Sequence, residues 1–148
     1  AGYAMRGGEI YIEGNAGYRA GIHMKAYQEH KPVLVIGGRA GSFLGEYQAG
    51  GLIVVLSLHT DGRPVVGYFP CTGMHGGKMV FRGDVSNIPF PPQVTSRPAT
   101  EEDMAEFAPY VREYCRLFHL DPEQLLRDAY TVITPDSKNP YQQMYVAN

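Results

Sequence analysis

The sequence predicts a mainly β protein, a β-helix of about four visible coils followed by a C-terminal helical segment that packs on it. Three observations lead to this prediction. Glycine supplies 18 of the 148 residues and is concentrated before Asp84. A strand-like segment recurs in that glycine-rich half about every nineteen residues. After Asp84 the repeat stops, and apolar residues follow a helical spacing instead.

The first half contains four related segments, MRGGEIYIEGN, KPVLVIGGR, QAGGLIVVLS and MHGGKMVFRGD. Two connections also match, because GNAGYRAG at 14–21 and GRAGSFLG at 38–45 have the same glycine spacing. Two intervals are longer, and we expect their extra residues in turns at 27–31 and 59–63, the second with the turn-like pair Asp61-Gly62. In a β-helix each unit is one coil, and like positions of successive coils stack.

Alternation within the strands assigns their two faces. Two columns are apolar in every coil and should line the interior, Ile10, Leu34, Ile53 and Met79 in one and Ile12, Ile36, Val55 and Phe81 in the other. The positions between them are largely charged in the first and last coils, as at Glu9, Lys78 and Arg82. In the middle two coils they form an apolar patch, which consists of Val33, Val35, Leu52, Val54 and Leu56. We expect the C-terminal segment to cover this patch, and cover by another domain or subunit is the alternative.

The glycine-rich turn after 33–36 could instead open a dinucleotide-binding unit. That unit needs the spacing G-x-G-x-x-G and then a helix. The glycines at 37–45 lack this spacing, and the further glycines after Gly41 disfavour a helix there. We therefore interpret the glycines as structural, since tight corners need positive φ and stacked coils leave little room for side chains. This role is assigned to Gly8, Gly14, Gly17, Gly21, Gly38, Gly41, Gly45, Gly51, Gly77 and Gly83.

The second half predicts different elements. The proline-rich run IPFPPQVTSRP at 88–98 is expected to be an extended strap more than a strand, because proline cannot donate to a sheet. A helix should begin after Thr100, which opens a capping-box-like Thr-x-x-Asp with acids in the first turn. Its buried stripe should consist of Met104, Phe107, Val111, Tyr114, Cys115 and Phe118.

Asp121-Pro122-Glu123 predicts the start of a shorter helix that ends near Asp128, and 130–134 is a last strand-like run. The expected organisation is one domain with three parts. They are a glycine-repeat β-helix at 1–87, a proline-rich connector at 88–99 and a helical C-terminal extension at 100–148.

Composition argues against several classes of function. The formal net charge is −2 and no Lys/Arg-rich run occurs, so neither a nucleic acid nor an anionic membrane is an expected partner. No apolar run is long enough to span a bilayer. Two distant cysteines make no disulfide framework, so a reducing cytoplasm is the simplest location. The chain begins at Ala1 and not at Met, which is compatible with a preceding segment.

Three residues are candidates for chemistry. His23 and His75 could each act as a general base, and Cys71 lies four residues before His75, as a base-activated thiol could. A hydrogen-bonded corner histidine and a buried inert cysteine are the favoured interpretations, so we predict no catalytic, cofactor-binding or metal-binding residue. The alignment also places a mildly basic column beside a methionine-rich column. The basic side chains could bind an anion or simply form a row of solvent-exposed residues. The columns are Arg6, Lys25, Ala49 and His75, and Met5, Met24, Gln48 and Met74.

Three runs carry a family resemblance: GSFLGEYQAGGLIVVL, GYFPCTGMHGGKMVFRGD and YTVITPDSKNPYQQMYV. They strongly resemble the C-terminal glycine-repeat (GXGXG) domain of glutamate synthase large subunits, in a stand-alone or domain-sized form. The resemblance covers nearly the whole chain. Two departures are that fewer coils are visible than that domain usually has and that Lys31-Pro32 stands where paired glycines are expected.

The resemblance implies a right-handed β-helix that is structural and non-catalytic. Such a domain sits beside a glutaminase module and a synthase module that carries FMN and an iron–sulfur cluster, so this chain would hold no cofactor itself. The whole enzyme makes glutamate from glutamine and 2-oxoglutarate, with electrons from a nicotinamide or ferredoxin. A homo-oligomer is left open. The alternatives are the glycine-repeat subunit of a formylmethanofuran dehydrogenase-like complex and a stand-alone β-helix enzyme with a histidine base.

Overall fold

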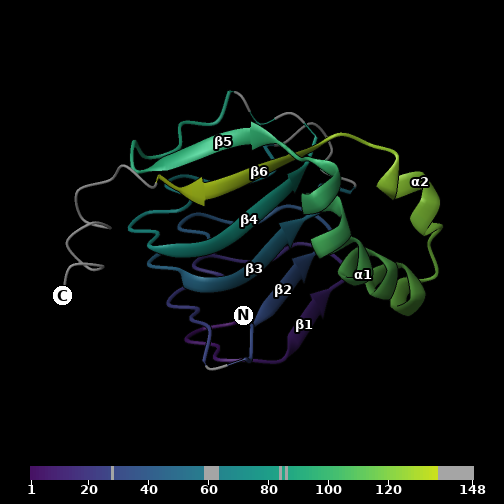
Figure 1. Ribbon diagram of the computed structural model, residues 1–148, viewed down its shortest axis with the longest axis horizontal. Coiled ribbons are helices and arrows are strands. Elements are labelled where there is room, and N and C mark those ends of the chain that lie inside the picture. The colour runs from purple at the N-terminus through teal and green to yellow at the C-terminus, as the bar shows by residue number, and fades with distance from the viewer. Residues whose placement is uncertain (28, 59–63, 84, 86, 137–148) are drawn as a thin grey trace.

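The computed structural model describes residues 1–136 except 28, 59–63, 84 and 86, and the protein is mainly β. One six-stranded mixed sheet has the strand order β1-β2-β3-β4-β6-β5, and its described strands close into no barrel (Figure 1). The strands are β1 (Glu9–Ile12), β2 (Val33–Ile36), β3 (Ala49–Val55), β4 (Gly76–Arg82), β5 (Val94–Pro98) and β6 (Tyr130–Pro135). The helices are α1 (Glu101–Phe118) and α2 (Pro122–Leu126).

The four glycine-repeat strands are parallel, and their register matches the alignment of the repeats. Ile10 pairs with Leu34, Leu34 with Ile53, and Ile53 with Met79. The second predicted column, from Ile12 to Phe81, pairs in the same way. Both columns face a core cluster in which every member from β2, β3 and β4 is fully buried. The predicted interior is therefore confirmed.

Between these strands the chain returns on the side of the sheet opposite α1 (Figure 1). Successive returning segments hydrogen-bond to each other, because the amide of Gly45 donates to Ala20 O at 2.9 Å and that of Cys71 to Leu44 O at 2.9 Å. Met24, Leu44 and further apolar side chains of these segments complete the core behind the sheet. The returning segments thus form a second wall.

The predicted turns have different outcomes. Tyr27 and His30 exchange backbone hydrogen bonds of 2.9 and 2.8 Å, as a turn at 27–31 requires. The expected turn at 59–63 lies outside the described residues. Residues 42–47 form turns, so no helix follows Gly41 and the dinucleotide-binding alternative is wrong.

Helix α1 covers the apolar patch of the middle coils within the same chain, as predicted. The patch clusters with buried Phe107, Val111, Tyr114 and Cys115, and Met104 and Phe118 pack at its margin. The helix begins as the sequence indicates, since Thr100 and Asp103 form both hydrogen bonds of a capping box. Asp121 caps α2, which ends at Leu126, two residues before its predicted end.

The proline-rich connector is a correction. Residues 94–98 were expected in a strap, but they form β5, which pairs antiparallel with β6 at the edge of the sheet. An edge strand tolerates Pro98, because one side of its backbone needs no partner. The strand-like run at 130–134 is confirmed as β6, and it lies between β4 and β5. Among the described residues, neither helix combines the length and apolar character that a bilayer span requires.

Candidate interaction surface

The returning segments have an unusual backbone. Every second residue over 19–23, 43–47 and 69–73 has positive φ, the left-handed conformation. The first left-handed column is Arg19, Phe43 and Phe69, at φ 58°, 62° and 58°. The second is Gly21, Gly45 and Cys71, and the third is Ala4, His23, Tyr47 and Gly73. Most of these residues carry a side chain, although a left-handed L-residue costs about 1–2 kcal/mol.

Hydrogen bonds between neighbouring segments hold this backbone. The amides of Arg19 and Phe43 donate to Ser42 O and Tyr68 O, both at 2.8 Å. In the third column, the amides of His23 and Tyr47 donate to Glu46 O at 2.8 Å and Thr72 O at 2.7 Å. The conformation is therefore fixed by long-range pairing.

The second left-handed column faces the core. A Cβ at Gly21 would lie 2.8 Å from Ile53 Cδ1, and one at Gly45 would overlap Met79 Cε. The third segment has Cys71 in this place, and its Sγ lies 3.5 Å from Met79 Sδ. Gly21 and Gly45 are thus required both by φ and by space.

The other glycines that were assigned a structural role fall into three groups. Gly8, Gly51, Gly77 and Gly83 have positive φ. Gly38 and Gly41 have ordinary φ but lack room, since a Cβ would overlap Asn15 Oδ1 at Gly38 and lie 2.8 Å from Gly17 C at Gly41. A Cβ at Gly14 or Gly17 meets nothing within 4 Å, and no steric reason for glycine exists at either position.

The first and third columns direct aromatic side chains outward. Phe43 stacks on Phe69 at 5.3 Å between ring centroids, and Tyr18 meets Phe43 edge-on at 5.6 Å. In the third column, His23 stacks on Tyr47 at 5.1 Å, and Tyr3 meets His23 edge-on at 6.0 Å. We call this surface the aromatic face; its members are Tyr3, Tyr18, His23, Phe43, Tyr47, Tyr68 and Phe69.

Most of these rings are exposed, although Phe43 is half-buried. Tyr68 is 75% exposed, Tyr3 70%, Tyr18 62%, Phe69 61% and Tyr47 45%. Single exposed apolar side chains are ordinary, but a group of stacked aromatic rings indicates a binding surface.

The charge on this side is mainly positive. The guanidinium of Arg19 lies 4.5 Å from the Phe43 ring centroid and forms an ion pair of 2.6 Å with Glu46. Glu46 is 8% exposed, so that acid is largely withdrawn from solvent. Arg6, Lys25 and His75 of the basic column are all exposed. Backbone hydrogen bonds join the successive segments that carry this column. The Lys25 amide donates to Met5 O at 3.0 Å, and the His75 amide donates to Gln48 O at 2.7 Å.

The residues considered for catalysis lie in different environments. His23 lies within the aromatic stack and His75 is exposed, whereas Cys71 is fully buried. Burial raises the pKa of the Cys71 thiol to about 12, so the neutral form dominates at physiological pH. Within the described ranges, no group of three or more His, Cys, Asp or Glu residues could hold a metal ion.

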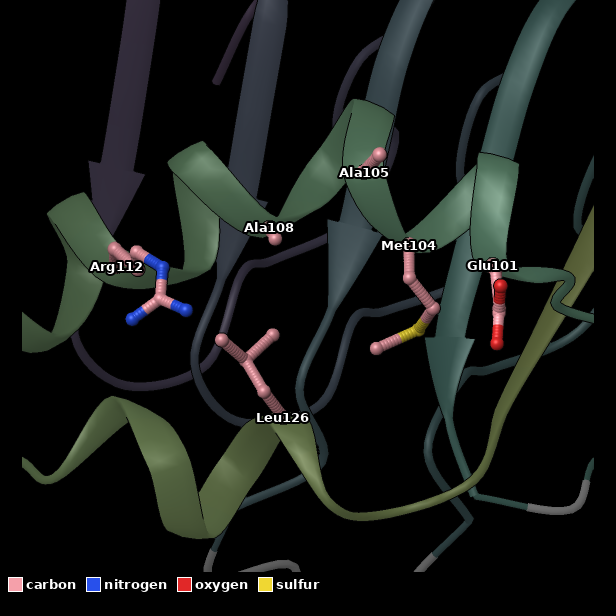
Figure 2. Close-up of a pocket in the computed structure, with 6 residues that line it drawn as sticks. All are labelled: Glu101, Met104, Ala105, Ala108, Arg112 and Leu126. Atoms are coloured by element: carbon pink, nitrogen blue, oxygen red, sulfur yellow. The ribbon is translucent and has the colours of Figure 1, made fainter.

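A shallow hollow between α1 and α2 offers no better chemistry. Figure 2 shows Met104, Ala108 and Leu126 in it, with Glu101 and Arg112 at its two ends. Glu101 and Arg112 are eleven positions apart along the helix, or about 16 Å of helix rise, too far to act on one bond. Arg112 already pairs with Glu123 at 2.6 Å. This hollow is therefore no candidate active site.

Comparison with known proteins agrees with the glycine-repeat architecture. The family model described as the GXGXG motif matches residues 1–137. The chain belongs to the GXGXG motif family. This GXGXG chain is also similar to the uncharacterized protein MJ1350 of Methanocaldococcus jannaschii, with 43% identity over 137 residues. That alignment covers 88% of the chain and 52% of the relative, so the chain spans about half the length of that relative.

Sequence reasoning missed the aromatic face of the GXGXG chain, although a signal for it was present. Tyr18, Phe43, Tyr68 and Phe69 all lie in connections between repeats, Phe43 and Phe69 at equivalent positions of the first left-handed column and Tyr18 and Tyr68 one residue before it. The predicted columns came from the strands, whereas these aromatic residues recur in the connections.

Proposed function

We propose that this GXGXG chain is a structural, non-catalytic domain or subunit of a glutamate synthase, whose stacked coils hold the glutaminase and synthase modules at a fixed separation. The observation that carries the proposal is the family match over residues 1–137, since that family suggests a glutamate synthase-related domain. The FMN and iron–sulfur cluster of such an enzyme would belong to the partner modules. Two unpaired, buried cysteines suit a cytoplasmic enzyme of nitrogen metabolism.

A right-handed β-helix is the architecture we propose for the glycine-repeat half. Four parallel strands and three returning segments, each paired with its neighbours, support it. Connections between parallel strands of one sheet are right-handed in about 98% of cases. Such a stack would hold the modules at a fixed separation, because the backbone of each coil is hydrogen-bonded to that of the next.

The positions of the candidate residues favour a structural role over a stand-alone histidine enzyme. A nucleophile and its base must lie within hydrogen-bond reach of each other. Cys71 lies in the core while His75 is exposed, and His23 is engaged with Tyr3 and Tyr47.

The test is co-expression with the glutaminase and synthase polypeptides of the same organism. We expect a stoichiometric complex on size-exclusion chromatography, and expect the isolated chain to carry no flavin absorbance and no glutaminase activity. A matched control uses an unrelated β-helix protein of similar size with the same polypeptides. Stoichiometric FMN on the isolated chain would contradict the proposal, as would a complex formed only with formylmethanofuran dehydrogenase subunits.

A further inference from the structure

We propose that the aromatic face, together with the basic column beside it, binds a protein surface that presents carboxylates around an apolar centre. This inference rests on the proposed function, under which the partner is the catalytic polypeptide of the synthase. It concerns which surface docks and what chemistry the partner must offer.

The first argument is the backbone. Phe43, Tyr47 and Phe69 are left-handed, at φ 62°, 57° and 58°. Glycine would adopt these angles without cost, as it does at Gly45 in the second column and at Gly73 in the column of Tyr47. Strained non-glycine residues that persist on a surface point to a functional constraint on their side chains. The constraint here selects an outward aromatic ring.

The second argument is the contrast between the two sides of the molecule. The outer side of the sheet carries an apolar patch, and α1 buries it. On the returning segments, Tyr18, Tyr68 and Phe69 remain more than half exposed. Tyrosine, phenylalanine and arginine are enriched at protein interfaces, and aromatic anchors provide much of the binding energy.

The third argument is charge complementarity. Arg6 donates to His23 O at 3.0 Å, which ties the basic column to the third left-handed column, and exposed Lys25 follows His23 by two residues. The nearby acid Glu46 is already neutralised by Arg19. A chain with a net charge of −2 therefore presents a locally basic, aromatic side. A partner with carboxylates at its rim would associate faster and in one orientation.

The fourth argument is preorganisation and an adjacent hollow. Because the amides of His23, Phe43 and Tyr47 each donate to the next segment, their backbone has little conformational entropy to lose on binding. At Tyr68 the face adjoins a hollow of about 370 Å³ that is also lined by Arg39, Val66 and Ile88. Arg39 is anchored there by a 2.8 Å hydrogen bond from Nε to Pro64 O. A partner side chain with an apolar body and a carboxylate would fit this hollow.

Single-stranded nucleic acid also binds basic surfaces with aromatic rings. The aromatic face favours protein instead, because its two central rings are each already held between two others. Phe43 lies between Tyr18 and Phe69, and His23 between Tyr3 and Tyr47. Bases need an open ring face for stacking.

The experiment measures binding of the purified chain to the synthase polypeptide by isothermal titration calorimetry. The variant Phe43→Gly/Phe69→Gly removes two rings while it suits the left-handed backbone, so the fold should persist. We expect an affinity loss of about thirtyfold or more, the value for loss of an interface anchor. Lys25→Glu should weaken binding and reduce its salt dependence. The control is Leu117→Ala, an exposed apolar residue of α1, which should stay within about twofold of wild type.

The outcomes separate the two proposals. Equal affinity of the wild-type chain and the double-glycine variant overturns this inference and leaves the proposed function intact. No binding by the wild-type chain overturns both. Binding of single-stranded oligo(dT) that is lost in the double-glycine variant, without binding of the polypeptide, overturns the inference in favour of nucleic acid. Circular dichroism melting of each variant confirms the folded state.

Discussion

The hydroxyl of Tyr114, in α1, donates a hydrogen bond of 2.7 Å to the main-chain carbonyl of Glu13, which directly follows β1. These residues are 101 positions apart, so the bond fixes the helix against the first strand of the repeat. Gly37 lies beneath it, where a Cβ would overlap both the Tyr114 hydroxyl and the Glu13 carbonyl oxygen. Burial raises the Tyr114 pKa to about 12, which keeps its hydroxyl protonated as a donor.

Gly37→Ala should therefore destabilise the chain more than Tyr114→Phe. The phenylalanine variant loses one hydrogen bond, at about 1 kcal/mol, whereas the added methyl group at Gly37 forces α1 or the strand to move, at about 2–3 kcal/mol. Urea unfolding followed by circular dichroism measures both. Gly17→Ala is the control, because its Cβ would meet nothing within 4 Å, and it should cost less than about 0.5 kcal/mol. Similar costs for the two glycine variants would show that the space above Gly37 is not limiting.

The left-handed backbone at Phe69 predicts a reversal of the usual order of glycine and alanine. Phe69→Gly should be more stable than Phe69→Ala by about 1 kcal/mol, because only alanine retains the strain at φ 58°. At Leu117, inside α1, the order should be the opposite by a similar amount, since glycine weakens a helix. Thermal unfolding of the four variants checks both signs. Alanine more stable than glycine at Phe69 would mean that this residue is not held in the left-handed conformation.

The sequence predicted the elements whose cause is local or repeated. Four copies of one strand pattern fixed the register from Ile10 to Met79, because each copy constrains the alignment of the others. The stripe of α1 and its capping box follow from helical spacing within one segment. The apolar patch and the stripe of α1 each need an apolar partner, so their contact could be inferred from the sequence.

The parts that were missed depend on distant partners. β5 forms a strand because β6, more than thirty residues later, provides its hydrogen-bond partners, although Pro98 and the prolines that precede β5 argue against a strand. Phe43 is held in the left-handed conformation by the bond of its amide to Tyr68 O in the next segment, although local propensity disfavours that conformation. The candidate surface was missed because the match between the connections at 14–21 and 38–45 rests on their glycines and not on their aromatic residues.

Cys71 should be inert toward thiol reagents in the folded chain. It is fully buried, and its pKa of about 12 keeps the neutral thiol up to mildly alkaline pH. Labelling with iodoacetamide should therefore be slow at pH 7 and at pH 9 and become fast in denaturant. Peptide mass mapping distinguishes Cys71 from Cys115, and a Cys71→Ala variant identifies the Cys115 signal. Fast labelling of Cys71 in the native state would reopen the case for a reactive thiol.

Asp103 should make stability depend on acid pH. Its carboxylate accepts from Arg97 Nη2 at 3.0 Å, from the Thr100 amide at 2.8 Å and from Lys78 Nζ at 3.1 Å. The Arg97 hydrogen bond is the main reason that the Asp103 pKa lies well below its usual value. The folded state therefore binds this proton more weakly than the unfolded state, whose pKa is about 3.9. The stabilisation is complete above about pH 5 and is lost as pH falls from there.

Asp103→Asn should consequently lower the free energy of unfolding by about 2 kcal/mol at pH 7, because charged hydrogen bonds are replaced by neutral ones. The difference from wild type should narrow between about pH 5 and pH 2, as the wild-type carboxylate becomes protonated. Asp128→Asn is the matched control. Asp128 also pairs with an arginine, Arg82, but its side chain is 44% exposed, so its loss should cost under about 1 kcal/mol at any pH. Urea unfolding at several pH values across this range measures the free energy of unfolding of each variant. If the loss for Asp103→Asn did not change with pH, it would come from packing and not from the charge that joins β4, β5 and α1.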